Sequence, residues 1–104
     1  MKIHFSKVFG TVLCSMIITC SVAQTNGKVY ENRVVKSAIL GRDVSFAVYL
    51  PADYETSSRT YPVVYLLHGY TDDHTGWLQF GEINRFADKA IAEGTIPPMI
   101  IVMP

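Results

Sequence analysis

The stretch from Tyr61 to Tyr70 constrains the fold more than any other part of this sequence, because a wholly apolar segment meets a glycine turn there. Val63 to Leu67 is an uninterrupted apolar run, a pattern typical of a strand in a parallel sheet that helices cover on both faces. His68-Gly69 follows at once, and glycine lets the chain turn where a side chain would collide. We therefore predict a buried strand whose end presents backbone N–H groups at the rim of the sheet.

The second half of the sequence is typical of a strand–helix–strand unit. Met99 to Met103 is another wholly apolar run and predicts the second strand. An amphipathic helix is expected between the strands, with a stripe at helical spacing formed by Ile83, Phe86, Ala87, Ala90 and Ile91. The charged residues expected on its outward face are Glu82, Arg85, Asp88, Lys89 and Glu93. Gly94 is expected to end the helix in a left-handed conformation.

The segment from Lys28 to Leu50 predicts two antiparallel strands. In its second half, two sets of residues alternate with the period of two that is typical of a half-buried strand. One set is Val44, Phe46, Val48 and Leu50, and the other is Ser45, Ala47 and Tyr49. Gly41-Arg42 stands where a tight turn is needed, and Pro51 ends the second strand because proline has no N–H to donate. Residues 52–61, rich in Ser, Thr and Asp, are expected to form a surface loop.

The first 23 residues are typical of a secretory signal. The positively charged residues Lys2 and Lys7 precede the apolar run Val8 to Ile18. This run is too short to span a bilayer core of ~30 Å comfortably. The small residues of Ser21-Val22-Ala23 predict cleavage after Ala23. The sequence therefore predicts a signal peptide over 1–23, one domain or the N-terminal portion of one over 24–104, and a secreted or periplasmic protein without stable membrane insertion.

A lipid anchor on Cys20 is the alternative, although Thr19 is a poor residue immediately before a lipidated cysteine. Cys14 and Cys20 both lie in the signal, so residues 24–104 have no cysteine to form a disulfide. A hydrophobic fraction of 49% and a charged fraction of 17% describe a globular domain. Nine basic and nine acidic residues are scattered without a basic stripe, which argues against a nucleic-acid partner.

Five segments together resemble one family, the α/β-hydrolase esterases of carbohydrate esterase family one, which includes feruloyl and acetylxylan esterases, some of them modules of xylanases. The segments are Val48 to Pro51, Leu66 to Tyr70, the Asp72-Asp73 loop running to Trp77, Ala87 to Gly94, and Pro98 to Val102. The resemblance implies the N-terminal part of an α/β-hydrolase fold, an antiparallel hairpin followed by a βαβ unit.

This resemblance implies a serine carboxylic-ester hydrolase, in which an activated serine attacks an acyl carbonyl and backbone N–H groups stabilise the oxyanion. Carried over by position, one of these donors is the backbone N–H of Tyr70, in the oxyanion loop that contains Gly69. His68 is expected to shape that loop rather than act as the catalytic base. Trp77 is expected either to line the acyl or sugar pocket or to serve in plain packing.

The sequence departs from the family pattern in one respect. It contains no serine in a Gly-x-Ser-x-Gly elbow, and Ser57 and Ser58 lie in a polar loop without that glycine frame. We therefore expect a fragment, truncated before the nucleophile elbow, that is inactive by itself. No cofactor or metal is expected, because the adjacent Asp72, Asp73 and His74 cannot all point at one ion on an extended loop.

The expected substrate is an acylated plant cell-wall polysaccharide or oligosaccharide such as xylan, carrying feruloyl or acetyl groups. Appended glycosidase or binding domains are compatible with this family. Two alternatives stay open: a non-catalytic carbohydrate-binding or scaffold module, and an acyltransferase that passes the acyl group to a sugar hydroxyl on the same fold.

Overall fold

A computed structural model describes residues 26–104. The predicted signal peptide and the alternative lipid site at Cys20 lie outside the described residues. The elements are β1 (Lys28–Ser37), β2 (Arg42–Leu50), β3 (Val63–Tyr65), α1 (Gly76–Gln79), α2 (Ile83–Ala92) and β4 (Ile100–Met103). Over this range, no helix has the length and apolar character needed to cross a bilayer.

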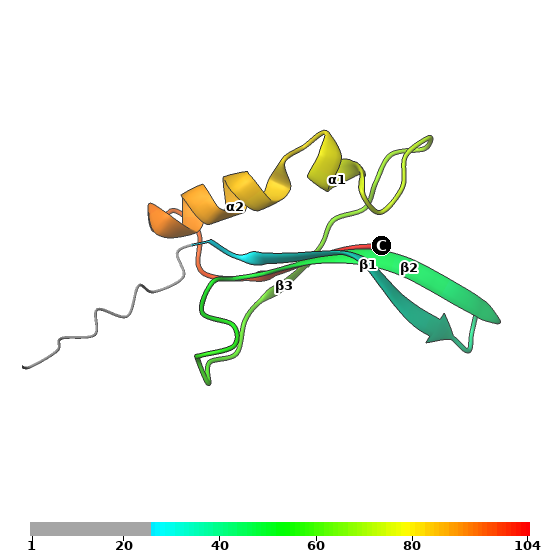
Figure 1. Ribbon diagram of the computed structural model, residues 1–104, viewed down its shortest axis with the longest axis horizontal. Coiled ribbons are helices and arrows are strands. Elements are labelled where there is room, and N and C mark those ends of the chain that lie inside the picture. Colours follow the sequence, from blue (N-terminus) through cyan, green and yellow to red (C-terminus); the bar gives the residue numbers. More distant parts are fainter. Residues whose placement is uncertain (1–25) are drawn as a thin grey trace, which may run out of the picture.

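The four strands form one mixed sheet in the order β1-β2-β4-β3. β1 pairs with β2 and β2 with β4 in antiparallel fashion, while β3 and β4 are parallel and are connected through α2. The expected hairpin followed by a βαβ unit is therefore confirmed. Both helices lie on one face of the sheet, and the loop between β2 and β3 extends from the other side (Figure 1).

The β1–β2 hairpin follows the pattern of its turn residues. Gly41 has a φ of 63°, a left-handed conformation that glycine adopts without a steric penalty, and Pro51 directly follows β2. The register runs from Lys28 opposite Leu50 to Ser37 opposite Arg42, with an irregularity between Tyr30 and Arg33. This irregularity is a bulge, and it presents the side chain of Asn32 toward His74 in the loop that follows β3.

Both apolar runs form strands shorter than expected. The prediction that the first run is a buried strand is wrong within residues 26–104, because all three residues of β3 are exposed at the edge of the sheet. β3 begins at Val63 but ends at Tyr65, although the N–H of Leu66 still donates to the C=O of Val102 at 2.8 Å. The next bond of this parallel register would need an N–H on residue 104, which is a proline and has none. The ladder therefore stops, and the backbone leaves the sheet at Leu67, just before His68-Gly69.

The core lies between the sheet and α2. It consists of Ala47, Tyr49, Ala87, Ile101 and Met103, all of them buried. The alternation along β2 is confirmed, but the fully buried set is not the more apolar one, because Ala47 and Tyr49 face α2. Val44, Phe46, Val48 and Leu50 are half-buried on the face that no helix covers within residues 26–104.

Helix α2 confirms most of the predicted stripe. Ala87 is buried, Ile83 and Ile91 pack against the core, and Gly94 ends the helix with a φ of 72°. The N–H of Gly94 donates to the C=O of Ile91 at 3.1 Å, as expected for a left-handed helix stop. The prediction that Phe86 belongs to the buried stripe is wrong, because its side chain is 61% exposed. Phe86 lies about 100° around the helix from Ala87, at the flank of the stripe.

Asp88 was expected on the outward face, and the structure contradicts this. Its Oδ1 atom accepts two hydrogen bonds, from the hydroxyl of Tyr49 at 2.7 Å and from the backbone N–H of Gly27 at 2.7 Å. The buried hydroxyl of Tyr49 needs an acceptor, and the flank of α2 supplies one. One carboxylate therefore joins α2, β2 and the residue before β1.

Tyr49 should make stability depend on pH in the alkaline range. Burial, together with the hydrogen bond to Asp88, raises the pKa of Tyr49 above its ordinary value of 10.0. A raised folded-state pKa means that the stabilisation is fully present below about pH 10 and is lost as pH rises further. Urea unfolding between about pH 8 and 11.5 should show this loss, and Tyr49→Phe should flatten the decline. An equal decline in both proteins would contradict the assignment.

Candidate active site

The loop after β3 begins with a tight turn that places Tyr70. The N–H of Asp72 donates to the C=O of Gly69 at 3.1 Å, so Tyr70 and Thr71 are the two central residues of a four-residue turn. Tyr70 has a negative φ, since Glu82 is the one non-glycine residue with a positive φ among residues 26–104. The expected oxyanion loop at Gly69 and Tyr70 is thus an ordered turn at the end of a strand.

Two donors hold the carbonyl group of Gly69. The Nδ1–H of His68 donates to this oxygen at 2.7 Å, and the N–H of Asp72 is the second donor. Because the peptide unit is planar and trans, fixing the C=O of Gly69 also directs the N–H of Tyr70 to the opposite side. The imidazole of His68 therefore shapes the loop, in agreement with the role expected for it.

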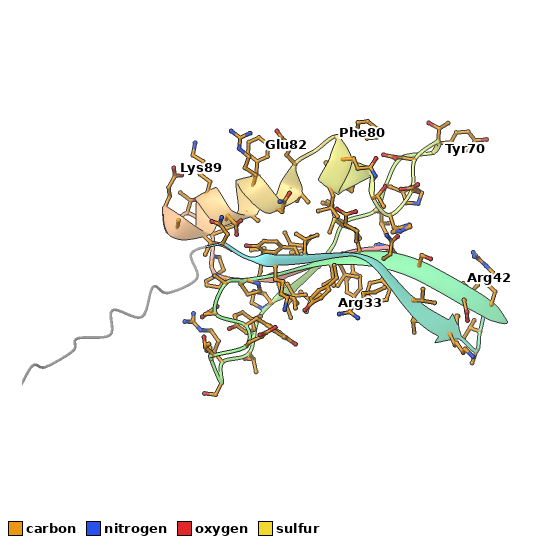
Figure 2. The ribbon with its side chains drawn as sticks, in the orientation of Figure 1. Arg33, Arg42, Tyr70, Phe80, Glu82 and Lys89 are labelled. Carbon is orange, nitrogen blue, oxygen red and sulfur yellow. The ribbon has the colours of Figure 1, made fainter. Side chains whose placement is uncertain are left out.

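The N–H of Tyr70 has no hydrogen-bond acceptor in the part of the chain that the structure describes. Its side chain is fully exposed at the outer tip of the loop and points away from the sheet (Figure 2). The backbone donor is therefore oriented and unused, which is the condition that an oxyanion-hole donor requires.

The rest of the loop is fastened by its own polar groups. Asp73 Oδ1 accepts from the hydroxyl and the N–H of Thr75, at 2.6 and 2.8 Å, and these bonds lower the pKa of the Asp73 carboxyl. His74 Nε2–H donates to Asn32 Oδ1 at 3.1 Å, joining the loop to the bulge in β1. Gly76 is buried, and a β-carbon on it would overlap the carboxylate of Asp72. These contacts make the loop a rigid connection between β3 and α1.

Asp72, Asp73 and His74 engage different partners rather than one centre. Across residues 26–104, no group of three or more His, Cys, Asp or Glu side chains is arranged to hold a metal ion. Within the same range, no serine hydroxyl is hydrogen-bonded to a histidine, and Ser57 Oγ instead accepts from the N–H of Arg59 at 3.1 Å. Residues 26–104 thus contain a backbone N–H without an acceptor at Tyr70 but no nucleophile–base pair.

Trp77 lies in α1, and its indole Nε1–H donates to the C=O of Leu67 at 2.9 Å. The ring also lines a hollow of about 250 Å³, together with Gly69, Asp72, Gly76, Phe80 and Gly81. The structure therefore brings Gly69 and Trp77, two of the expected site residues, to one hollow beside the turn.

The sequence analysis did not identify Phe80 as a residue that lines the hollow, or Asn32 as a residue that holds the loop. Phe80 is 81% exposed beside the hollow, and its spacing of three residues from Trp77 was the signal that could have indicated it (Figure 2). Asn32 carried no such signal, because its contact with His74 spans 42 positions of the sequence.

Comparison with known proteins gives one family. The profile of the Esterase family, described as "Putative esterase", matches residues 37–104. An endo-1,4-beta-xylanase/feruloyl esterase of Xylanibacter ruminicola is 40% identical over 60 residues, which cover 54% of this chain and 8% of that protein. An esterase of Mycobacterium tuberculosis is 38% identical over 69 residues, covering 66% of this chain and 14% of that protein.

Solved structures give the same result. A ferulic acid esterase superposes with a TM-score of 0.70 at 32% identity, covering 74% of this chain and 29% of that one. A ferulic acid esterase of carbohydrate esterase family one from Anaeromyces mucronatus, solved in complex with ferulic acid, superposes with a TM-score of 0.67 at 26% identity. That match covers 76% of this chain and 28% of the other, so the chain spans less than a third of each protein.

Proposed function

Because this chain belongs to the Esterase family and shares the α/β-hydrolase fold of carbohydrate esterase family one, we propose that it is the N-terminal part of a serine carboxylic-ester hydrolase. The proposed substrate is a feruloyl or acetyl ester of a plant cell-wall polysaccharide such as xylan. The observation that carries the proposal is the N–H of Tyr70, which is oriented by the clamped carbonyl of Gly69 and has no acceptor within residues 26–104.

In this mechanism the chain stabilises charge. When a serine oxygen attacks the ester carbon, the carbonyl oxygen becomes an oxyanion, and the N–H of Tyr70 donates a hydrogen bond to it. The base, which took the proton of the serine hydroxyl during the attack, gives it to the sugar oxygen as the carbonyl re-forms and the C–O bond to the sugar breaks, and water later hydrolyses the acyl-enzyme. The serine, its histidine base and the orienting carboxylate are assigned to the remainder of the complete protein.

The substrate assignment rests on two observations. Relatives are named as a xylanase/feruloyl esterase and as ferulic acid esterases, one of them in complex with ferulic acid. Trp77 and Phe80 give the hollow beside Tyr70 an aromatic wall, which suits a flat aromatic acyl group. We also propose that the protein is exported, since its first 23 residues have the pattern of a cleavable signal.

The complete protein should release ferulate from feruloylated xylo-oligosaccharide and lose this activity after treatment with a serine-directed sulfonyl fluoride. The reason is that a sulfonylated serine can no longer attack the ester, so no oxyanion forms. Ferulate release is measured by chromatography, with sulfonyl-fluoride-treated protein as the paired control. Binding of the oligosaccharide without release would identify a non-catalytic module, and transfer of ferulate to an added sugar would identify an acyltransferase.

A further inference from the structure

The carbonyl group of Leu67 marks the point where the chain leaves the sheet. Leu67 lies past the last residue of β3, and the last bond of the parallel ladder on this side is donated by the N–H of Leu66 to the C=O of Val102. Within residues 26–104, the one donor to this carbonyl is the indole Nε1–H of Trp77, at 2.9 Å and ten residues along the chain. A side chain therefore satisfies a carbonyl group to which no backbone N–H within residues 26–104 donates.

The bond closes the loop into a ring. From Leu67 the chain passes through the turn at Gly69–Asp72 and the hydrogen-bonded segment around Asp73 and Thr75, and reaches Trp77 at the start of α1. The N–H of Gly76 donates to the C=O of Asp73 at 3.0 Å, so the segment next to Trp77 is also held. Only His68 separates the carbonyl fixed by Trp77 from Gly69, whose carbonyl sets the direction of the Tyr70 N–H.

We propose that Trp77 is a positioning residue, whose indole N–H holds the carbonyl of Leu67 and thereby places the Tyr70 amide for oxyanion stabilisation. This inference rests on the proposed function. Without this bond the backbone that follows β3 can shift, and the Tyr70 amide shifts with it. A displacement of about 1 Å in a catalytic group can lower the rate about a hundredfold. A residue that only lined the hollow would instead act on substrate binding, so the two roles predict different kinetic changes.

Two variants of the complete protein isolate the N–H group. Trp77→Phe keeps an aromatic ring without the donor, and Trp77→3-benzothienylalanine replaces the N–H by sulfur in a ring of nearly the same shape. Both should lower kcat for feruloyl-oligosaccharide hydrolysis by roughly 10- to 100-fold while KM stays within about threefold of wild type. Gln79→Ala, an exposed residue of the same helix, is the matched control and should behave as wild type.

A double-mutant cycle tests whether Trp77 acts through the Tyr70 amide. In a Tyr70→Pro background, which has no N–H to place, Trp77→Phe should lower kcat by no more than about threefold further. A full multiplicative loss in that background, or a change in KM with kcat unchanged, would overturn the proposal. Thermal melting of each variant checks its folding, and the benzothienyl variant carries the test if Trp77→Phe does not fold.

The outcomes separate this inference from the proposed function. If the wild type releases no ferulate, or if Tyr70→Pro alone leaves kcat unchanged, the proposed function or its oxyanion donor is wrong. If Tyr70→Pro lowers kcat but both Trp77 variants match wild type, only the positioning role of Trp77 is wrong.

Discussion

Replacing Tyr70 with proline should lower kcat of the complete protein for ester hydrolysis by about 10²- to 10³-fold, equivalent to about 3 kcal/mol of transition-state stabilisation. Proline removes the backbone N–H and changes little else. Tyr70 is the second residue of a turn and has a negative φ, a position that proline favours, and its side chain is already fully exposed. The measurement is steady-state hydrolysis of a feruloyl ester, with KM expected to change less than kcat.

Tyr70→Ala is the matched variant, because it removes the phenol and keeps the amide. Its kcat should stay within about threefold of wild type, since the side chain makes no hydrogen bond within residues 26–104. Equal losses in both variants would show that the phenol, and not the backbone N–H, supports the reaction. Equal activity in both would show that the oxyanion forms elsewhere.

Replacing Asp88 with alanine should lower the free energy of unfolding by about 2–4 kcal/mol. The change leaves the buried hydroxyl of Tyr49 and the N–H of Gly27 without the acceptor they share, and each unpaired buried donor costs about 1–3 kcal/mol. Urea or thermal unfolding of the complete protein measures the loss. We place this effect on stability, because Asp88 lies on α2 and the hydrogen bonds that its Oδ1 atom accepts come from Gly27 and Tyr49, not from the loop at Tyr70.

Asp88→Asn provides the control for this prediction. The amide retains an oxygen that can accept from both donors, so the loss should fall to about 1–2 kcal/mol, the difference between charged and neutral acceptors. Tyr49→Phe removes one donor and should cost about 1 kcal/mol for the hydrogen bond. If Asp88→Ala were no more destabilising than an exposed substitution such as Lys89→Ala, the shared-acceptor interpretation would be wrong.

Local patterns predicted the four strands and α2, because each of these elements depends on neighbours in the sequence, while the short helix α1 was not predicted. The apolar runs around Val63 and Ile101 form the parallel pair, and Gly41 and Gly94 adopt left-handed conformations where their turns require them. The strand ends were less predictable. β3 stops at Tyr65 because its ladder partner meets Pro104, and that pairing is visible only after the strands are aligned.

Side chains with partners distant in the sequence were not predictable in this way. Asp88 and Tyr49 are 39 positions apart, and Asn32 and His74 are 42 positions apart. Helical periodicity counted Asp88 as a solvent-facing charge, because periodicity describes one helix and not the strand packed beside it. The resemblance to the esterase family indicated Gly69, Tyr70 and Trp77 as candidate site residues. Their contacts became visible only in the folded structure.

The sequence by itself determined the succession of the four strands and α2, the turn at His68-Gly69, and membership of the Esterase family, but it did not indicate α1. These follow from the period of apolar residues and from glycine and proline, whose effects act over a few neighbouring residues. Tertiary structure alone decided which face of β2 is buried, which carboxylate accepts from Tyr49, and that the indole of Trp77 binds the carbonyl of Leu67. Hydrogen bonds form between groups that folding brings within about 3 Å, and sequence spacing carries no record of those distances.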